Sequence, residues 1–294
     1  MIGDPADQIL AKEYIMMNEA ARVAVSSVFT THARALHTPF LHDTLIFDED
    51  PLSLLLEVNT LKIADLKKIK IASKSPLFGD YRTRLLPLQR YLESVEENEV
   101  LSLPDEFRID PSEEYHHVLN TEGIDSNLMK FMSCDHFYKD PSDRDLIHFV
   151  NRQDLPTDRK IIILSATIPT EIYKEMYGER VQVIDITDVT HTGTITQHTR
   201  YSYSRNSLSK RMKEVNCRLP DWPTITFKGF NEQIKGASPD MWFGNCSGYN
   251  QYTGVSINVL GTPHKHNAQY LLIGKALGVN VDVFNQGFRL QPVE

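Results

Sequence analysis

Cysteine is scarce in this 294-residue sequence: Cys134, Cys217 and Cys246 lie far apart, and no CxxC pair occurs. Such spacing is typical of a protein in a reducing compartment and not of a disulfide scaffold. Long apolar runs are also missing, so no segment is predicted to span a membrane. The stretch from Met1 to Leu10 has no apolar signal region. We therefore expect a cytoplasmic protein with no membrane partner.

Positive charge is in the minority, since 31 lysines and arginines stand against 39 aspartates and glutamates, for a net charge of −8. This balance excludes a protein that wraps nucleic acid with an overall basic surface, so any such binding needs a local groove. The hydrophobic fraction of 41% is ordinary for a folded protein, and the length suffices for two domains.

The stretch 43–51 combines a short apolar run with three consecutive acids. Residues 45–47 predict a buried strand, and a proline after the acids ends regular structure. Ligands of open α/β sheets bind at the carboxyl ends of strands. Asp48 is therefore placed to hold Mg²⁺ through water, and Glu49 to orient or deprotonate an attacking water. The alternative is a strand that runs into an acidic surface turn, which includes Asp50.

A strand and a short helix are predicted before this stretch. Residues 27–31 are β-branched and aromatic, which favours a strand, and residues 32–36 favour a helix. Strand, helix and strand at this spacing predict a βαβ unit with a parallel sheet. Thr30 and Thr31 would then share one sheet edge with the acids.

A second apolar run, 160–164, ends in small hydroxyl residues. If it is a strand of the same sheet, Ser165 and Thr167 reach the same edge, where they could hydrogen-bond an acid such as Asp50 and report on nucleotide state. The alternative is an ordinary strand end, in which the hydroxyls cap a helix over 171–177.

These stretches carry a resemblance to superfamily 2 helicases of the DEAD/DEAH type. Residues 47–50 and 163–167 resemble motifs II and III, and residues 30–34 are similar to the nucleic-acid-contacting motif between the Walker motifs. Residues 222–228 look like the strand of motif IV. Residues 243–263 are similar to motif V of the XPD and DinG branch, and a phage or mobile-element helicase is the other branch expected.

The resemblance implies ATP and Mg²⁺ as cofactors and single-stranded or duplex nucleic acid, DNA before RNA, as partner. It assigns Mg²⁺ coordination through water to Asp48 and water positioning to Glu49. The branch usually has an aspartate where Asn250 stands, so that acid's role does not carry over directly. The residues implied in coupling hydrolysis to lobe movement are Asp50, Ser165, Thr167, Gly248, Asn250 and Gly254. Those implied in nucleic-acid contact are Thr30, Thr31, His32 and Arg34.

Two parts of such a helicase are missing from the sequence. No GxxxxGK[ST] loop occurs, whose backbone amides and lysine would cradle the phosphates. Gly274-Lys275-Ala276 does not fit that pattern and is predicted as a helix of the second lobe. The QxxGRxxR motif after motif V is also absent. We therefore expect the central part of a helicase, either a fragment or a degenerate copy, that is inactive alone and works with remaining helicase segments or partner subunits. A non-catalytic nucleic-acid-binding remnant or scaffold subunit is the alternative.

The expected fold is α/β, with two RecA-like parallel-sheet lobes. Residues 1–196 form an incomplete first lobe, with motif II at 48–51 and motif III at 165–167, and residues 197–294 form a partial second lobe. The two motifs lie farther apart than a βα connection needs, which predicts an insertion over 52–158.

The insertion is expected to be mostly helical, because apolar residues recur at helical spacing over 54–71 and 81–95. Its acidic middle argues against close phosphate contact. An iron–sulfur cluster, which some related helicases carry here, needs four thiolates. Cys134 is the only cysteine of the insertion, so the cluster is excluded.

Basic residues outnumber acids over 190–213, against the average of the chain. Arg205 and Arg211, with nearby tyrosines, predict a groove that binds single strands by charge and stacking. The alternative is an interlobe linker that enters the second domain on a solvated basic helix.

Overall fold

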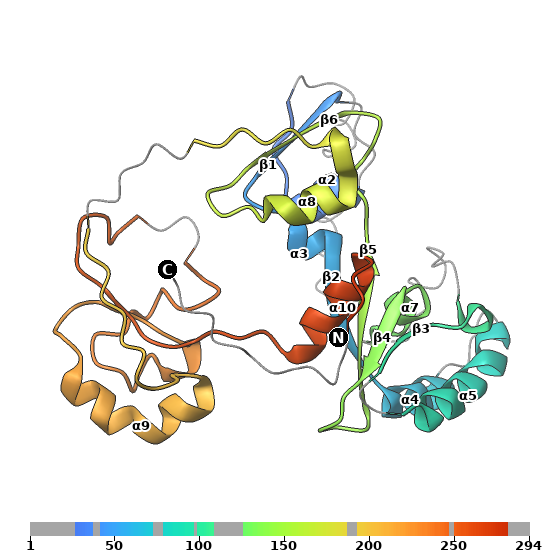
Figure 1. The fold of residues 1–294 in the computed structure, drawn as a ribbon. Coiled ribbons are helices and arrows are strands. Elements are labelled where there is room, and N and C mark those ends of the chain that lie inside the picture. The colour runs from blue at the N-terminus through green and yellow to red at the C-terminus, as the bar shows by residue number, and fades with distance from the viewer. Residues whose placement is uncertain are drawn as a thin grey trace, which may run out of the picture. The chain divides into compact units, whose positions relative to one another are not determined.

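In a computed structural model, the described residues are 27–37, 42–72, 79–96, 99–108, 126–186, 193–246 and 250–281. The chain divides into two compact units, one of residues 1–183 and 267–294 and the other of residues 184–266 (Figure 1). Helices alternate with both parallel and antiparallel strands, so the α/β class is confirmed. Among the helices of the described ranges, none has the length and apolar content needed to cross a bilayer.

The first unit contains a parallel pair of strands, β1 (Thr44–Asp48) and β6 (Lys160–Leu164). Their register places Leu45 opposite Ile161 and Asp48 opposite Leu164. The prediction that these two apolar runs are strands of one sheet is confirmed. Because the strands run parallel, their carboxyl ends meet at one edge.

Helices α2 (His32–His37) and α8 (Thr170–Tyr177) pack on this pair. Phe47 is completely buried in a core that includes Ala35 of α2 and Tyr173 of α8. Successive side chains of a strand point to opposite faces. The acid that follows Phe47 is therefore turned away from this core, toward solvent.

The strand predicted over 27–31 is not formed, because these residues are irregular and Phe29 is fully exposed. The tendency of β-branched residues to form strands depends on packing against neighbouring strands. No strand of the described chain pairs with this segment. The βαβ unit is thus replaced by a loop, α2 and β1.

The insertion is built on a four-stranded antiparallel sheet in the order β2-β5-β4-β3. The strands are β2 (Leu56–Lys62), β5 (Leu146–Arg152), β4 (His136–Lys139) and β3 (Val100–Ser102). Helix α3 (Leu52–Leu55) leads into it, and the carbonyl of Leu55 accepts the backbone N–H of Gln153 at 2.8 Å. The two ends of the inserted chain therefore lie side by side.

The helix predicted over 54–71 is wrong for residues 56–62, which form strand β2. Short apolar runs fit both a helix and a strand period, and pairing decides between them. Here β5 pairs with β2 along its whole length, from Leu56 opposite Arg152 to Lys62 opposite Leu146. The expected mostly helical module is thus a sheet with helices packed on it.

Helices pack on both faces of this sheet. Helices α4 (Ile63–Ala72), α5 (Gly79–Ser94) and α7 (Leu128–Met132) lie on one face, where the core includes Leu88, Phe131, Phe137 and Phe149. Helix α10 (Asn267–Ala276) covers the other face (Figure 1), with Ala268 and Leu272 against Tyr138 and Val150. The segment predicted as a helix of the second lobe therefore belongs to the first unit, because its apolar side is buried on the inserted sheet.

The buried Lys139 connects the end of β4 to helix α5. Lys139 donates its Nζ hydrogens to the carbonyls of Leu92, Glu93 and Val95 at 3.0, 3.2 and 3.0 Å. These carbonyls lie at the carboxyl end of α5, where intrahelical partners run out. The ammonium group therefore caps α5 and ties it to the sheet.

Asp140 is expected to make the stability of this module depend on pH in the acid range. Burial alone would raise its pKa, but hydrogen bonds from Ser142 and His148 lower the pKa to about 2. A carboxyl with a lowered folded-state pKa stabilises the fold above its unfolded pKa, and this contribution is lost as the pH falls from about 4 toward 2. We expect the melting temperature to fall over that range less steeply in Asp140→Asn than in the natural chain. Circular dichroism melts at stepped pH measure this, and parallel pH profiles would contradict it.

The second unit is organised around α9 (Arg205–Arg218) and a short parallel pair, β7 (Thr224–Ile225) and β8 (Asn258–Val259). Ser204 caps α9 by accepting the N–H of Ser207 at 3.4 Å. The buried core of the second unit consists of Leu208, Val215, Phe227, Ile234 and Leu260. Short 3-10 turns complete the described elements at Asp105–Phe107, Gly178–Arg180 and Lys228–Phe230.

Candidate functional site

The carboxyl ends of β1 and β6 bring the acids and the hydroxyl residues to one edge. Asp48 lies opposite Leu164, the last residue of β6, and Ser165 follows directly. The N–H of Glu49 donates to the carbonyl of Leu164 at 2.8 Å, which extends the ladder by one residue. The side chains of Asp48 and Glu49 are exposed. The predicted neighbourhood of the two motifs is therefore present, whereas the roles of their residues stay predictions.

The backbone of Glu49 is strained. Its φ is 99°. Among the described residues, Glu49 is the only one other than glycine with a positive φ. This conformation brings Cβ close to the backbone and costs on the order of 1–3 kcal/mol, so it persists only where surrounding contacts offset that cost. The chain thus turns sharply out of the sheet at the second acid.

Asp50 does not make the hydrogen bond predicted for it. Its Oδ1 accepts the hydroxyl of Tyr173 at 2.5 Å and the N–H of Leu52 at 3.0 Å. Ser165 instead accepts the N–H of Thr167 at 3.3 Å. Because the turn directs Asp50 toward α8, its carboxylate is engaged there and does not reach the hydroxyls.

The alternative role for the hydroxyls is not observed either. The residue at the N-cap of α8 is Pro169, and no side chain caps this helix. Ser165 and Thr167 therefore stabilise only a local turn at the end of β6. Sequence reasoning also missed Tyr173, for which no local signal exists, since it lies far from Asp50 along the chain.

The donor set at this edge suits only a lightly held cation. Asp48 and Glu49 present carboxylates to solvent, while that of Asp50 is occupied by Tyr173 and Leu52. Mg²⁺ keeps several waters and commonly binds one or two carboxylates together with phosphate oxygens. The residues therefore fit a Mg²⁺ that would take most of its ligands from water and a phosphate.

The residues expected to contact nucleic acid near α2 have partly structural roles. Thr31 accepts the N–H of Arg34 at 3.3 Å, as a residue at the start of a helix does. The ring of His32 meets that of Phe47 edge-on at 5.3 Å, so it packs on the core. Thr30 is exposed.

In the second unit, the two predicted arginines are held by aromatic rings. The guanidinium of Arg211 lies 3.9 Å from the ring centroid of Tyr201 and forms an ion pair with Glu214 at 3.3 Å. That of Arg205 lies 5.1 Å from the ring of Phe227. Such contacts stabilise the local structure and reduce the ability of each guanidinium to bind a ligand.

Lys210 and Lys213 are more available than these arginines. They lie on the exposed face of α9 at helical spacing, opposite the buried Leu208 and Val215. Within the described chain, no ion pair or hydrogen bond engages either ammonium group. The basic face of α9 (Lys210 and Lys213) is therefore the best placed cationic surface of this unit.

The motif V segment forms a turn. The carbonyl of Asn250 accepts the N–H of Thr253 at 3.1 Å, and Gly254 follows with a φ of 75°, which glycine adopts without strain. Gly248 lies outside the described residues. The positive φ thus gives a structural reason for Gly254, whereas the turn uses only the backbone carbonyl of Asn250. The coupling roles of both residues stay predictions.

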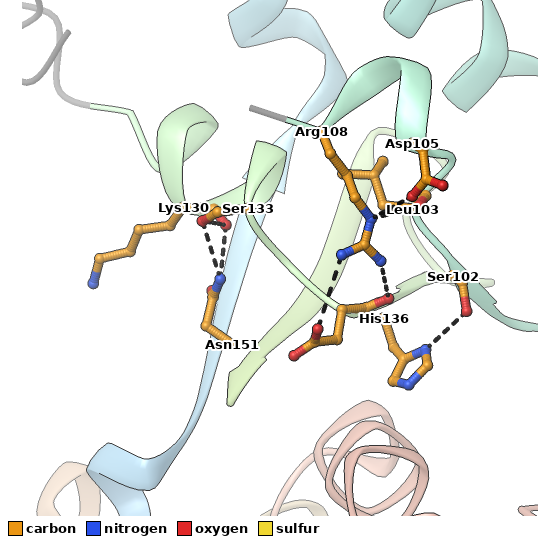
Figure 2. Close-up of polar contacts among 9 residues, drawn as sticks. Ser102, Leu103, Asp105, Arg108, Lys130, Ser133, His136 and Asn151 are labelled. Carbon is orange, nitrogen blue, oxygen red and sulfur yellow. Dashed lines mark hydrogen bonds and ion pairs between the residues drawn. The ribbon is translucent and has the colours of Figure 1, made fainter. Parts of the chain in front are cut away.

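A serine–histidine pair in the insertion has a structural explanation. Figure 2 shows His136 accepting or donating through Nδ1 to the hydroxyl of Ser102 at 3.2 Å. The two are direct partners in the β3–β4 ladder, so pairing alone brings them together. The pKa of His136 is lowered, mainly by burial. The charge of Asp135 raises this pKa, whereas the charges of Lys275 and Arg108 lower it further. No carboxylate orients this ring in the described structure, so it lacks the third member of a nucleophilic triad.

Arg108 and Asn151 join the parts of the same module (Figure 2). Arg108 donates to the carbonyls of Leu103 at 3.1 Å and Asp135 at 3.5 Å. Asn151 donates to the carbonyl of Lys130 at 2.9 Å, which fastens α7 to β5. These contacts explain the architecture of the insertion and indicate no chemistry.

Comparison with known proteins adds one similar structure. No protein-family model matches the chain, and no curated protein matches it. Among solved structures, a chain titled XPD in its apo form is similar with a TM-score of 0.39 and 13% identity. The match covers 81% of this chain and 64% of that one, so this chain spans less than two thirds of the XPD chain.

Proposed function

We propose that the first unit carries the cation-binding half of a helicase-type nucleoside-triphosphate site, in a chain that binds nucleic acid and does not hydrolyse ATP alone. One observation carries this proposal. Asp48 and Glu49 lie at the carboxyl end of β1, directly beside the end of β6 that leads into Ser165 and Thr167. The types and the order of these residues resemble motifs II and III.

In this proposal each acid has one task. Asp48 holds a hydrated Mg²⁺, and Glu49 orients a water toward a phosphate. When bound, Mg²⁺ neutralises phosphate charge. The sequence has no loop of backbone amides and lysine for the phosphates, so that part of the site comes from another segment or a partner subunit.

The test is the binding of Mn²⁺–ATP to the full chain. The water proton relaxation rate reports it, because that rate changes when the Mn²⁺ complex becomes bound to a protein. We expect Asp48→Asn to weaken Mn²⁺–ATP binding about tenfold, because it removes the carboxylate at the sheet edge. Asp43→Asn is the matched control, since this exposed acid precedes the opposite end of β1. Equal binding by both variants, or none by the natural chain, would refute the cation site.

A non-catalytic nucleic-acid-binding protein is the second candidate function. The basic face of α9 favours it, because it presents Lys210 and Lys213 without competing acids engaging them. This function needs no nucleotide and can hold even if the cation site fails. Its test is the salt-dependent binding experiment given in the Discussion.

A further inference from the structure

Tyr173 connects α8 to the acid turn (Glu49 and Asp50). The tyrosine is almost fully buried, with 3% of its surface exposed, yet its hydroxyl reaches the carboxylate of Asp50 at 2.5 Å. Asp50 in turn accepts the N–H of Leu52, the first residue of α3. One carboxylate therefore joins β1, α3 and α8, all within the first unit.

The acid turn needs such a connection because of its strain. On one side, the N–H of Glu49 is held by the carbonyl of Leu164. On the other, Asp50 is held by Tyr173 and Leu52. A non-glycine residue stays at a φ of 99° only where both flanks are fixed, because a free flank lets the backbone return to negative φ.

We propose that Tyr173 is a positioning residue for the acid pair: through Asp50 its hydroxyl imposes the left-handed turn at Glu49 and so sets the direction of the Asp48 and Glu49 carboxylates. The bond is suited to this task. A phenol that donates to a carboxylate makes a short, charge-assisted hydrogen bond. Burial raises the pKa of Tyr173, and so does the bond to Asp50, so the phenol keeps its proton at neutral pH.

Tyr177 provides a matched control on the same helix. Its ring stacks on that of Tyr173 with centroids 6.3 Å apart, and its hydroxyl accepts the N–H of Leu155 at 3.2 Å. A change to phenylalanine therefore removes a hydroxyl and one hydrogen bond here too, although a weaker, neutral one, and Tyr177 makes no hydrogen bond to Asp50 in the described structure.

The first experiment measures whether Tyr173 imposes the strain. Glu49→Gly removes the cost of positive φ, so it should favour folding more in the natural background than in Tyr173→Phe, where the turn has already relaxed. We expect its effect on the unfolding equilibrium constant to differ by about fivefold or more between the two backgrounds. In Tyr177→Phe it should equal the effect in the natural chain. Urea unfolding of the full-length variants gives these constants, and the same effect in all three backgrounds would overturn the proposal.

The second experiment measures the direction of the carboxylates and rests on the proposed function. Tyr173→Phe should weaken Mn²⁺–ATP binding about three- to tenfold, whereas Tyr177→Phe should leave it unchanged. Equal binding by both variants would mean that Tyr173 serves packing alone. If the natural chain binds no Mn²⁺–ATP, the proposed function fails, and the unfolding comparison still decides the role of Tyr173.

Discussion

We expect the purified chain, supplied with ATP and Mg²⁺, to release phosphate no faster than its Glu49→Gln variant, with or without DNA. The physical reason is the missing phosphate loop, whose backbone amides and lysine neutralise the transferring phosphoryl group. Removing one preorganised donor from such a site commonly costs about 10²–10³ in rate. Here several donors are missing together, so the exposed acids at the end of β1 have no positioned phosphate to act on.

Glu49→Gln is the informative control for this measurement. The amide keeps the size of the side chain but cannot accept a proton from water, so any difference between the two proteins reports the carboxylate. Asp48→Asn, which would lose the cation ligand, should also match them. DNA-stimulated turnover well above both variants would mean that this chain holds phosphates by residues outside the helicase pattern.

We expect the replacement of Lys210 and Lys213 by glutamine to remove most of the binding of the chain to single-stranded DNA at low salt. The chain carries a net charge of −8, so its affinity depends on few local cations. Each phosphate contact contributes about 0.7 to the slope of log affinity against log salt for single strands. Losing both lysines should therefore flatten the slope by about 1.4. Fluorescence anisotropy with labelled strands across a salt series measures it.

Lys228 and Lys235 are the matched control pair in the same unit. Lys228 lies over the ring of Trp242, and Lys235 pairs with Asp221 at 3.5 Å, so their charges are engaged. Their double glutamine variant should keep the natural slope. Binding should also be indifferent to base sequence, because phosphate contacts carry no base information. Salt-resistant binding, or a strong sequence preference, would contradict a backbone-binding face.

The structure changes the choice of residues for this experiment. The sequence points to Arg205 and Arg211, since both lie in the locally basic stretch. The rings of Phe227 and Tyr201 hold these guanidiniums, so replacing them would disturb packing as well as charge. The lysines avoid this confusion, because they lie on the exposed face of α9.

Short-range patterns predicted the acid edge correctly. The run 45–47 and the run 160–164 are short, apolar and bounded by polar turns, so their strand identity follows from local composition. Their parallel pairing is seen in the register of β1 and β6. The predictions were wrong for two segments whose structure depends on a partner strand. Residues 27–31 were predicted as a strand but have no partner in the described structure, and the segment of β2 was predicted as a helix but pairs with β5.

The sequence by itself determined the α/β class, the two strands and the placement of Asp48 and Glu49 directly after an apolar run, because these depend on neighbours along the chain. Only the tertiary structure decided that α10 covers the inserted sheet and that Tyr173 holds Asp50. Both are contacts between residues far apart in sequence, set by which apolar faces remain to be buried once the sheets have formed. Their energies come from burial and from a hydrogen bond shielded from water, neither of which leaves a periodic trace in the sequence.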